Sequence, residues 1–466
     1  MTKTKTTLLW VIAVFLFVTW GCAYITSGGE KPAEEDVIAT SVAETLAAGI
    51  KTPGAPLVVP TLTGEAPAPA APTSPAAATS EPPAPPAAAG ELLVAYVDTS
   101  RNLWVWQEGG EPRQLTSSAD VLTAQVSADG RWIAFTRSSD SLHESLWVIR
   151  SDGSGEQAIM DQEAFEAMPR GESAVTSRPF YFNWTPGSST LAFTTSPVYE
   201  GLGLSLNEDL WLADVESGSV EELLEPGEGG MFYYSPDGRQ IALVKPDSIS
   251  LIDADGSNRR DKVISYPIVS TYSEYFYYAT PQWAEDSSYL RVVIPAPAAL
   301  ERPEETTNVW HIPADGSPAE QVGSVVTAPL FFPALSPDLA QLAYVRQVGD
   351  AAENRRELHI YQIDTGGDTT YLTEAHLIFA AWAADSSRFA FTTGENNRPY
   401  LGQIGETPQA LTDTPSAFQI QWVDSDRFLF VSPSSPGFEL RLGVIGSASA
   451  LIATTENPLS FDFTGE

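Results

Sequence analysis

Residues 234–245 read YSPDGRQIALVK, and this stretch is one of seven related copies between residues 126 and 432. Each copy starts with an aromatic or aliphatic residue, continues through a polar turn and ends in a short apolar run. The turn residues reverse the chain, because proline fixes φ, aspartate bonds nearby backbone and glycine tolerates positive φ. The run after the turn alternates as a half-buried strand does. One copy therefore predicts two antiparallel strands joined by a tight turn.

The copies recur at intervals of 40 to 58 residues, and they begin at Val126, Trp184, Tyr234, Trp283, Leu335, Trp382 and Trp422. Such a period is typical of propeller blades and solenoid units. A third strand such as Leu146–Val148 and a fourth such as Pro408–Leu411 complete one unit. The sequence therefore predicts an all-β fold, a single β-propeller over residues 91–466.

Counting strands predicts how the ring closes. Eight second strands are found, the first being LLVAYV at Leu92–Val97, but only seven first strands precede them. The missing one is supplied by the C-terminus, where Leu459–Phe463 (LSFDF) matches FQIQW at Phe418–Trp422. We expect this strand to pair with Leu92–Val97, which gives eight blades, with seven as the alternative. Closure removes sheet edges that would otherwise invite aggregation.

The turns YSPDGRQIAL, LSPDLAQLAY and VSADGRWIAF, with the LWV and DGS elements that follow them, resemble the TolB-type, WD40-like repeat known as PD40. The resemblance covers nearly all of residues 91–466 and implies a propeller. It implies no function, because families that share the repeat do unrelated jobs. The copies at Trp184 (WTPGSS) and Trp422 (WVDSDR) depart from the pattern.

The N-terminus predicts export and anchoring. Lys3 and Lys5 precede an uncharged run from Leu8 to Trp20, and Gly21-Cys22 follows. This order is that of a secretory signal, and it resembles a bacterial lipoprotein signal with Cys22 as the lipidated residue. Thr19 and Trp20 depart from the usual residues there, so the alternative is an uncleaved membrane helix over Leu8–Ile25. Both interpretations predict an extracytoplasmic protein held to a bacterial membrane.

Residues 23–90 predict a flexible stalk between the anchor and the propeller. Glu34–Ile50 is compatible with one short helix, and the tract from Thr52 to Gly90 is rich in proline and alanine. That composition buries no core and favours extended polyproline conformations. At about 3.1 Å per residue the tract reaches about 100 Å.

The charge balance excludes two classes of partner. The 25 lysines and arginines against 60 aspartates and glutamates give a formal charge of −35. Such a field repels nucleic acid and anionic lipid surfaces. The single cysteine, Cys22, excludes an intrachain disulfide. We expect a monomer.

Loop lengths predict where a ligand binds. Within blades, the longest second-to-third-strand connections are at Ser196–Glu208, Pro295–Thr307 and Gln347–Arg356, and long blade-to-blade connections are at Asp161–Pro179 and Ser265–Thr280. Propeller topology brings both classes of connection to one face. Insertions gathered on one face indicate a binding surface.

One of these connections is rich in aromatic residues. We therefore predict contacts from four tyrosines and three arginines of neighbouring loops: Tyr266, Tyr272, Tyr275, Tyr277, Arg302, Arg355 and Arg356. Tyrosine offers large, rigid contact area with a polar tip. The alternative is that Phe276 and Tyr278 belong to an extended first strand packed between blades, and that the arginines are ordinary solvated surface.

No catalytic, metal or cofactor motif is found. The histidines His143, His311, His359 and His376 are far apart, and neither HExxH nor GxSxG occurs. We expect His311 and His359 in third strands. Asp253–Asn258 resembles the start of a calcium loop, but Ile264 stands where the last ligand, a glutamate, belongs. A strand hairpin is the better interpretation.

The sequence therefore predicts a binding or scaffold module for an envelope protein or glycan. The alternative is a propeller glycoside hydrolase or lyase acting in the central channel, and a sensor domain is a third possibility. Carboxylates and histidines converging on the channel would favour the enzyme. A channel lined by Gln125, Asn183, Gln282 and Gln421 would favour binding.

Overall fold

The computed structural model describes residues 92–464 except 139, 141, 169–173, 200–205, 273–274, 299–301, 303–304, 329–330, 350–353 and 457–459. Cys22, the anchor and the stalk lie outside the described residues. The described chain forms eight four-stranded antiparallel sheets and one additional hairpin. The predicted eight-bladed, all-β propeller is confirmed, and the seven-bladed alternative is wrong. No helix among the described residues has the length and apolar character needed to cross a bilayer.

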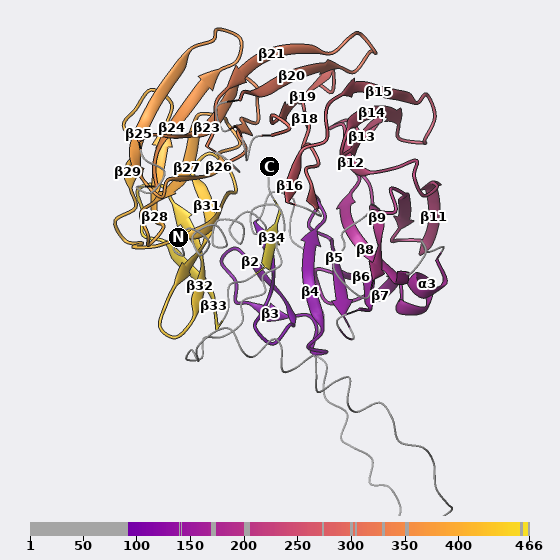
Figure 1. Cartoon of the computed structure of the whole chain (residues 1–466). Coiled ribbons are helices and arrows are strands. Elements are labelled where there is room, and N and C mark those ends of the chain that lie inside the picture. The colour runs from indigo at the N-terminus through magenta and orange to yellow at the C-terminus, as the bar shows by residue number, and fades with distance from the viewer. Residues whose placement is uncertain are drawn as a thin grey trace, which may run out of the picture. The chain divides into compact units, whose positions relative to one another are not determined.

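Each blade runs from its first, inner strand to its fourth, outer strand (Figure 1). The first four blades are β34 (Ser460–Phe463), β1 (Leu93–Val97), β2 (Leu103–Gln107) and β3 (Arg113–Gln114); β4 (Val121–Val126), β5 (Trp132–Ser138), β6 (Glu144–Arg150) and β7 (Gln157–Met160); β8 (Ala174–Trp184), β9 (Thr190–Tyr199), β10 (Leu210–Asp214) and β11 (Ser219–Leu224); and β12 (Met231–Tyr234), β13 (Gln240–Lys245), β14 (Ser248–Asp253) and β15 (Arg260–Ser265).

The last four blades follow the same order. They are β18 (Gln282–Trp283), β19 (Tyr289–Ile294), β20 (Thr307–Pro313) and β21 (Glu320–Val325); β22 (Ala334–Leu335), β23 (Gln341–Gln347), β24 (Arg355–Gln362) and β25 (Asp368–Ala375); β26 (Ile378–Trp382), β27 (Arg388–Thr393), β28 (Arg398–Gln403) and β29 (Gln409–Ala410); and β30 (Phe418–Trp422), β31 (Arg427–Pro433), β32 (Phe438–Val444) and β33 (Ala450–Thr455). As expected, 253–260 joins third and fourth strands, and His311 and His359 lie in third strands.

The C-terminal strand closes the ring as predicted. β34 pairs antiparallel with β1, with Val94 opposite Phe463 and Val97 opposite Ser460. Leu93 and Thr464 lock the end of the pair, since the Leu93 N–H donates to Thr464 Oγ1 at 3.0 Å and the Thr464 N–H donates to the Leu93 carbonyl at 2.9 Å. Figure 1 shows the yellow β34 among the indigo strands of the first blade.

The repeated turn has the conformation that its sequence predicts. In the fourth blade, Ser235 Oγ donates to Asp237 Oδ1 at 2.7 Å and accepts the Gln240 N–H at 2.9 Å. Gly238 follows at φ +70°. The copies that lack this glycine at Trp283, Leu335 and Trp382 place Ser287, Leu339 and Ser386 in the same left-handed region, at φ near +60°. The turn geometry is therefore kept where glycine is absent, at some cost in backbone strain.

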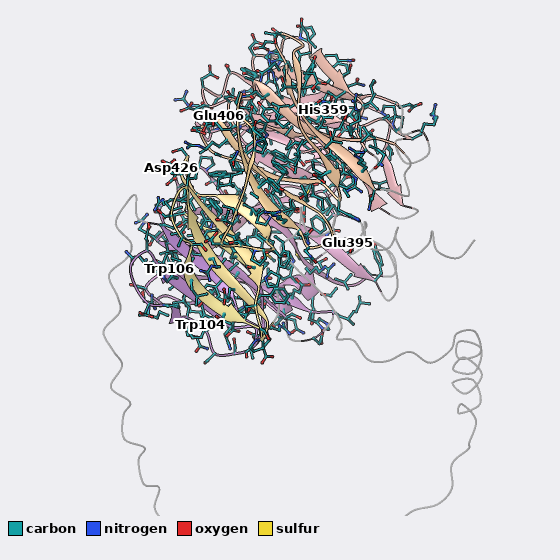
Figure 2. The ribbon with its side chains drawn as sticks, turned by 90° about the vertical axis from the view of Figure 1, so that its left-hand side faces the viewer. Trp104, Trp106, His359, Glu395, Glu406 and Asp426 are labelled. Atoms are coloured by element: carbon teal, nitrogen blue, oxygen red, sulfur yellow. The ribbon has the colours of Figure 1, made fainter. Side chains whose placement is uncertain are left out.

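The apolar core is divided among the blade interfaces. Eight buried clusters occur in the described chain, and each lies between two consecutive blades. The cluster between the last and first blades includes Leu429 and Val431 facing Val94 and Trp106. Figure 2 shows Trp104 and Trp106 where the indigo strands of the first blade meet the yellow strands of the last. The ring is thus closed by packing as well as by strand pairing.

Candidate binding face

Strand direction separates the propeller into two faces. First-to-second and third-to-fourth connections emerge on one face, here called the short-turn face, and the other connections emerge on the long-loop face. β1 is a second strand, so it starts at the short-turn face, and β34 is a first strand, so it ends there. Both ends of the described propeller therefore leave from the face opposite to the long connections.

The long connections carry structure that the sequence did not predict. α3 (Gln162–Ala167) lies in the connection between the second and third blades, where Asp161 Oδ1 accepts the Ala164 N–H at 2.9 Å and Phe165 is fully buried. β8 and β9 extend as an 11- and a 10-residue strand beyond their repeat. A small hairpin of β16 (Ser270–Tyr272) and β17 (Tyr275–Phe276) interrupts the connection between the fourth and fifth blades.

Two of the predicted tyrosine contacts pack inward. Tyr266 is 8% exposed, and its hydroxyl donates to the Lys245 carbonyl at 2.9 Å. Tyr277 is half-buried, and its hydroxyl donates to the Val293 carbonyl at 3.1 Å. Burial raises the pKa of both phenols above the usual range. Tyr266 belongs to the buried cluster between the fourth and fifth blades, and Tyr277 packs against this cluster.

Two large apolar side chains in and next to the hairpin are exposed. The Tyr277 N–H donates to the Val269 carbonyl at 2.9 Å, so Ile268 and Phe276 fall on the opposite side of this ladder from Val269 and Tyr277. Ile268 is 49% exposed and Phe276 is 50% exposed. The alternative that Phe276 packs between blades is therefore wrong, while Tyr278 does pack against the interblade cluster. Ile268 and Phe276 are called the hairpin patch below. Tyr272 and Tyr275 are paired across β16 and β17.

The three arginines differ in environment. Arg302 is exposed and forms an ion pair with Glu305. Arg355 is exposed at the start of β24. Arg356 is 5% exposed, so solvated surface, the alternative weighed above, is wrong for this residue. Its guanidinium lies 4.2 Å from the centre of the Phe331 ring.

Two of the predicted residues are brought near one another. The Tyr277 ring lies 4.8 Å from the Phe332 ring. The Arg356 guanidinium lies over the ring of the neighbouring residue, Phe331. The connection at 326–333 therefore links the hairpin to the start of β24. The sequence reasoning missed this link, although the FFP at Phe331–Pro333 marks an apolar stretch in a connection.

Around the axis, neighbouring inner strands are joined by polar side chains. Gln125 Nε2 donates to Asn183 Oδ1 at 3.1 Å, and Gln282 Nε2 donates to the Ser336 carbonyl at 3.2 Å. Asp462 Oδ2 accepts the Val126 N–H at 2.7 Å. In the part of the chain that the structure describes, no group of three or more histidine, cysteine, aspartate and glutamate side chains is arranged to hold a metal ion. No catalytic assignment follows from this arrangement.

Among the described histidines, His359 has the most side-chain hydrogen-bond partners, and it is part of the packing of the sixth blade. His359 (Figure 2) is buried, with Nδ1 3.2 Å from both Asp368 carboxylate oxygens and Nε2 3.1 Å from Glu357 Oε2. Tyr344 also donates to Asp368, at 2.7 Å. The hydrogen bond from Arg346, followed by that from His359, lowers the pKa of Glu357.

Comparisons with known proteins agree on the fold alone. No family model and no curated protein matches the chain. TolB from Acinetobacter baumannii is 16% identical, with a TM-score of 0.32 over 60% of this chain and 63% of that chain, which is less than two thirds of TolB. An oligogalacturonate lyase from Vibrio parahaemolyticus is 14% identical, with a TM-score of 0.43 over 74% and 84%. A eukaryotic initiation factor is 9% identical, with a TM-score of 0.50 over 81% and 99%.

The fold and the long-loop face together define the structural class of this protein. The chain is an eight-bladed β-propeller closed by its C-terminal strand, with extra structure on one face. The similar structures include an initiation factor, and the propeller fold by itself implies no activity.

Proposed function

We propose that this protein is an extracytoplasmic binding or scaffold module, tethered to a bacterial membrane by its N-terminus, which engages an envelope protein through the long-loop face. One observation carries the proposal. The chain ends of the described propeller leave from the short-turn face, whereas the hairpin patch lies on a connection of the opposite face. The described chain therefore begins and ends on the face opposite to the elaborated one.

The chemistry of the hairpin patch favours a protein over a glycan. Ile268 and Phe276 are two of the five large apolar side chains that are exposed in the described chain. Exposed apolar residues held on a connection that is itself anchored by Tyr266 and Tyr277 offer a rigid contact to a partner's apolar side chains. A glycan site would need a larger share of hydrogen-bonding groups around an aromatic ring.

The test is an affinity pull-down from detergent-solubilised envelope with the full-length chain as bait. The variant I268S/F276S removes the hairpin patch without touching the buried tyrosines. The matched control is Leu451→Ser, which removes an equally exposed apolar side chain from the outer strand β33. A protein retained by wild type and L451S but lost from I268S/F276S supports the proposal. Equal retention by all three baits, or no specific protein at all, refutes it.

Anchoring is tested separately. Cys22→Ser removes the candidate lipidation site, and the lipoprotein proposal expects the protein to move from the membrane fraction to the soluble extracytoplasmic fraction. Retention of C22S in the membrane fraction indicates the alternative, an uncleaved helix over Leu8–Ile25. A cytoplasmic location for either protein would contradict the extracytoplasmic proposal.

A further inference from the structure

Arg356 is a buried cation with neutral neighbours. It is the second residue of β24, and only 5% of its surface is exposed. Its Nη2 donates to Asn354 Oδ1 at 2.6 Å, its Nη1 makes a long contact of 3.4 Å with the Leu377 carbonyl, and its Nε has no acceptor. Among the described residues no carboxylate lies within ion-pair distance of this guanidinium.

A comparison within the same ring shows how unusual this is. Arg291 is about as deeply buried, at 8% exposed, but its Nη2 is 2.9 Å from Asp364 Oδ1 and its Nη1 donates to the Leu339 carbonyl at 2.6 Å. The chain has 60 acidic residues against 25 basic ones, so acidic partners are abundant. Burial lowers the pKa of Arg356 to about 10, which reflects the cost of the unbalanced charge.

The Arg356 guanidinium is held by neutral acceptors, the Asn354 amide oxygen and the Leu377 carbonyl. Arginine nitrogens only donate hydrogen bonds, so the amide oxygen Oδ1 of Asn354 must face Arg356. The amide nitrogen Nδ2 of Asn354 then faces His376 Nδ1, at a distance of 3.0 Å. His376 Nδ1 then accepts this hydrogen bond. The His376 N–H donates to the Asn354 carbonyl at 3.0 Å, which fixes the two segments together. Asn354 and His376 are positioning residues for the guanidinium.

We propose that Arg356 anchors a binding site for an oxyanion, a carboxylate or phosphate group of a ligand, on the long-loop face of the sixth blade. Nε has no acceptor and Nη1 has only the long contact with the Leu377 carbonyl, so these two nitrogens would bind the oxyanion, while Phe331 supports the plane and Asn354 holds Nη2. A buried cation without a counter-charge is costly, and a bound anion relieves that cost. This site goes beyond the proposed protein contact, because its test needs no partner.

The experiment is calorimetric titration of the full-length chain in detergent with sodium phosphate and with sodium acetate, at constant ionic strength. Arg356→Gln is compared with Arg355→Gln, which removes the same formal charge from the adjacent, exposed position. We expect saturable binding to wild type, binding to R355Q within about 3-fold, and a loss of at least about 10-fold in R356Q. The two titrants distinguish a phosphate site from a carboxylate site. The I268S/F276S variant should bind the anion as wild type does, which separates this site from the hairpin patch.

Two outcomes overturn the proposal. Equal anion binding by wild type and R356Q would show that Arg356 does not anchor the ion. The segment 350–353 carries Asp350 and Glu353 and lies outside the described residues. Binding that appears only in a D350N/E353Q variant would show that the chain's own acids neutralise Arg356. If R356Q fails to fold, Arg356→Lys keeps the charge but lacks the planar fork, and it should bind the anion at least about 3-fold more weakly than R355Q.

Discussion

The indole Nε1 of Trp283 donates a hydrogen bond of 3.0 Å to the carbonyl oxygen of Tyr233, which belongs to the preceding blade. Trp382 forms the same bond with the Ala334 carbonyl, also at 3.0 Å. Trp422 occupies the equivalent position in the last blade, but its buried Nε1 has no acceptor. The same aromatic residue of the repeat is thus bonded across some interfaces and only packed across another.

This difference predicts unequal effects of one substitution. Trp283→Phe loses packing and the interblade hydrogen bond, whereas Trp422→Phe loses packing and relieves an unsatisfied N–H. Both indoles are similarly buried, at 7% and 8% exposed. We expect W283F to lower the free energy of unfolding by about 1 kcal/mol more than W422F, as measured by urea denaturation. Equal losses would mean that the Trp283 bond contributes nothing net.

Two glycines in third strands make room for facing phenylalanines. A Cβ at Gly402 would overlap the Phe389 ring, and a Cβ at Gly443 would overlap the Phe428 ring. Gly402→Ala and Gly443→Ala are each expected to lower the free energy of unfolding by about 2 kcal/mol or more, because the rings are fully surrounded. Gly367→Ala is the control, since its Cβ would meet Thr365 Oγ1 at an ordinary 3.4 Å. A tolerated G402A would show that the Phe389 ring can move aside.

Asp462 makes ring closure depend on pH. Burial raises the pKa of its carboxyl to about 6, and hydrogen bonds from the backbone of Val126 and Phe463 offset only part of this. The folded state therefore holds the Asp462 proton more tightly than the unfolded state does. The stabilisation is fully present below about pH 4 and is lost as the pH rises to about 6.

The corresponding variant is Asp462→Asn, whose amide oxygen still accepts the Val126 N–H. Carboxyls with lowered pKa values, such as Asp237, give the wild type an opposite trend, so the difference between the two proteins is the readout. We expect D462N to gain roughly 2 kcal/mol on wild type between pH 4 and pH 7 in urea denaturation. A difference that stays constant over this range would show that the Asp462 carboxyl is solvated.

Deletion of residues 460–466 tests closure directly. It removes β34 from the first blade and exposes the inner edge of β1. We expect a melting temperature lower by at least about 5 °C and an increased tendency to aggregate, measured by calorimetry and light scattering. The reference is the full-length chain with Thr464→Val, which loses one bond of the pair and keeps the strand. An unchanged melting temperature would show that interblade packing alone holds the ring.

Much of the fold was predictable because each repeat contains the local sequence signals for its own turn and strands. The turn residues from Ser235 to Gly238 and the apolar run from Ile241 to Val244 are local signals. The closing strand was found because Leu459–Phe463 fits a pattern that was otherwise one copy short. The helix α3 gave no such signal, since it is only six residues long and is held by the burial of one side chain, Phe165.

The site was less predictable because exposure depends on contacts between connections. Composition marked the segment 266–278, but it could not tell Tyr277, which packs inward, from Phe276, which points out. The period of two places neighbours on opposite sides, yet which side faces the core is decided by the fourth and fifth blades. Arg356 was expected on a loop, but it contacts Phe331 of another connection and Asn354 just before its own strand.

The apolar clusters at all eight interfaces change what it takes to unfold any part of the molecule. In an open array of repeats the terminal unit has one neighbour, and fraying starts there. In this ring each blade has two neighbours, so releasing any one of them breaks two cores at once. Proteases that act on transiently opened chain should therefore find few partially unfolded forms of this domain.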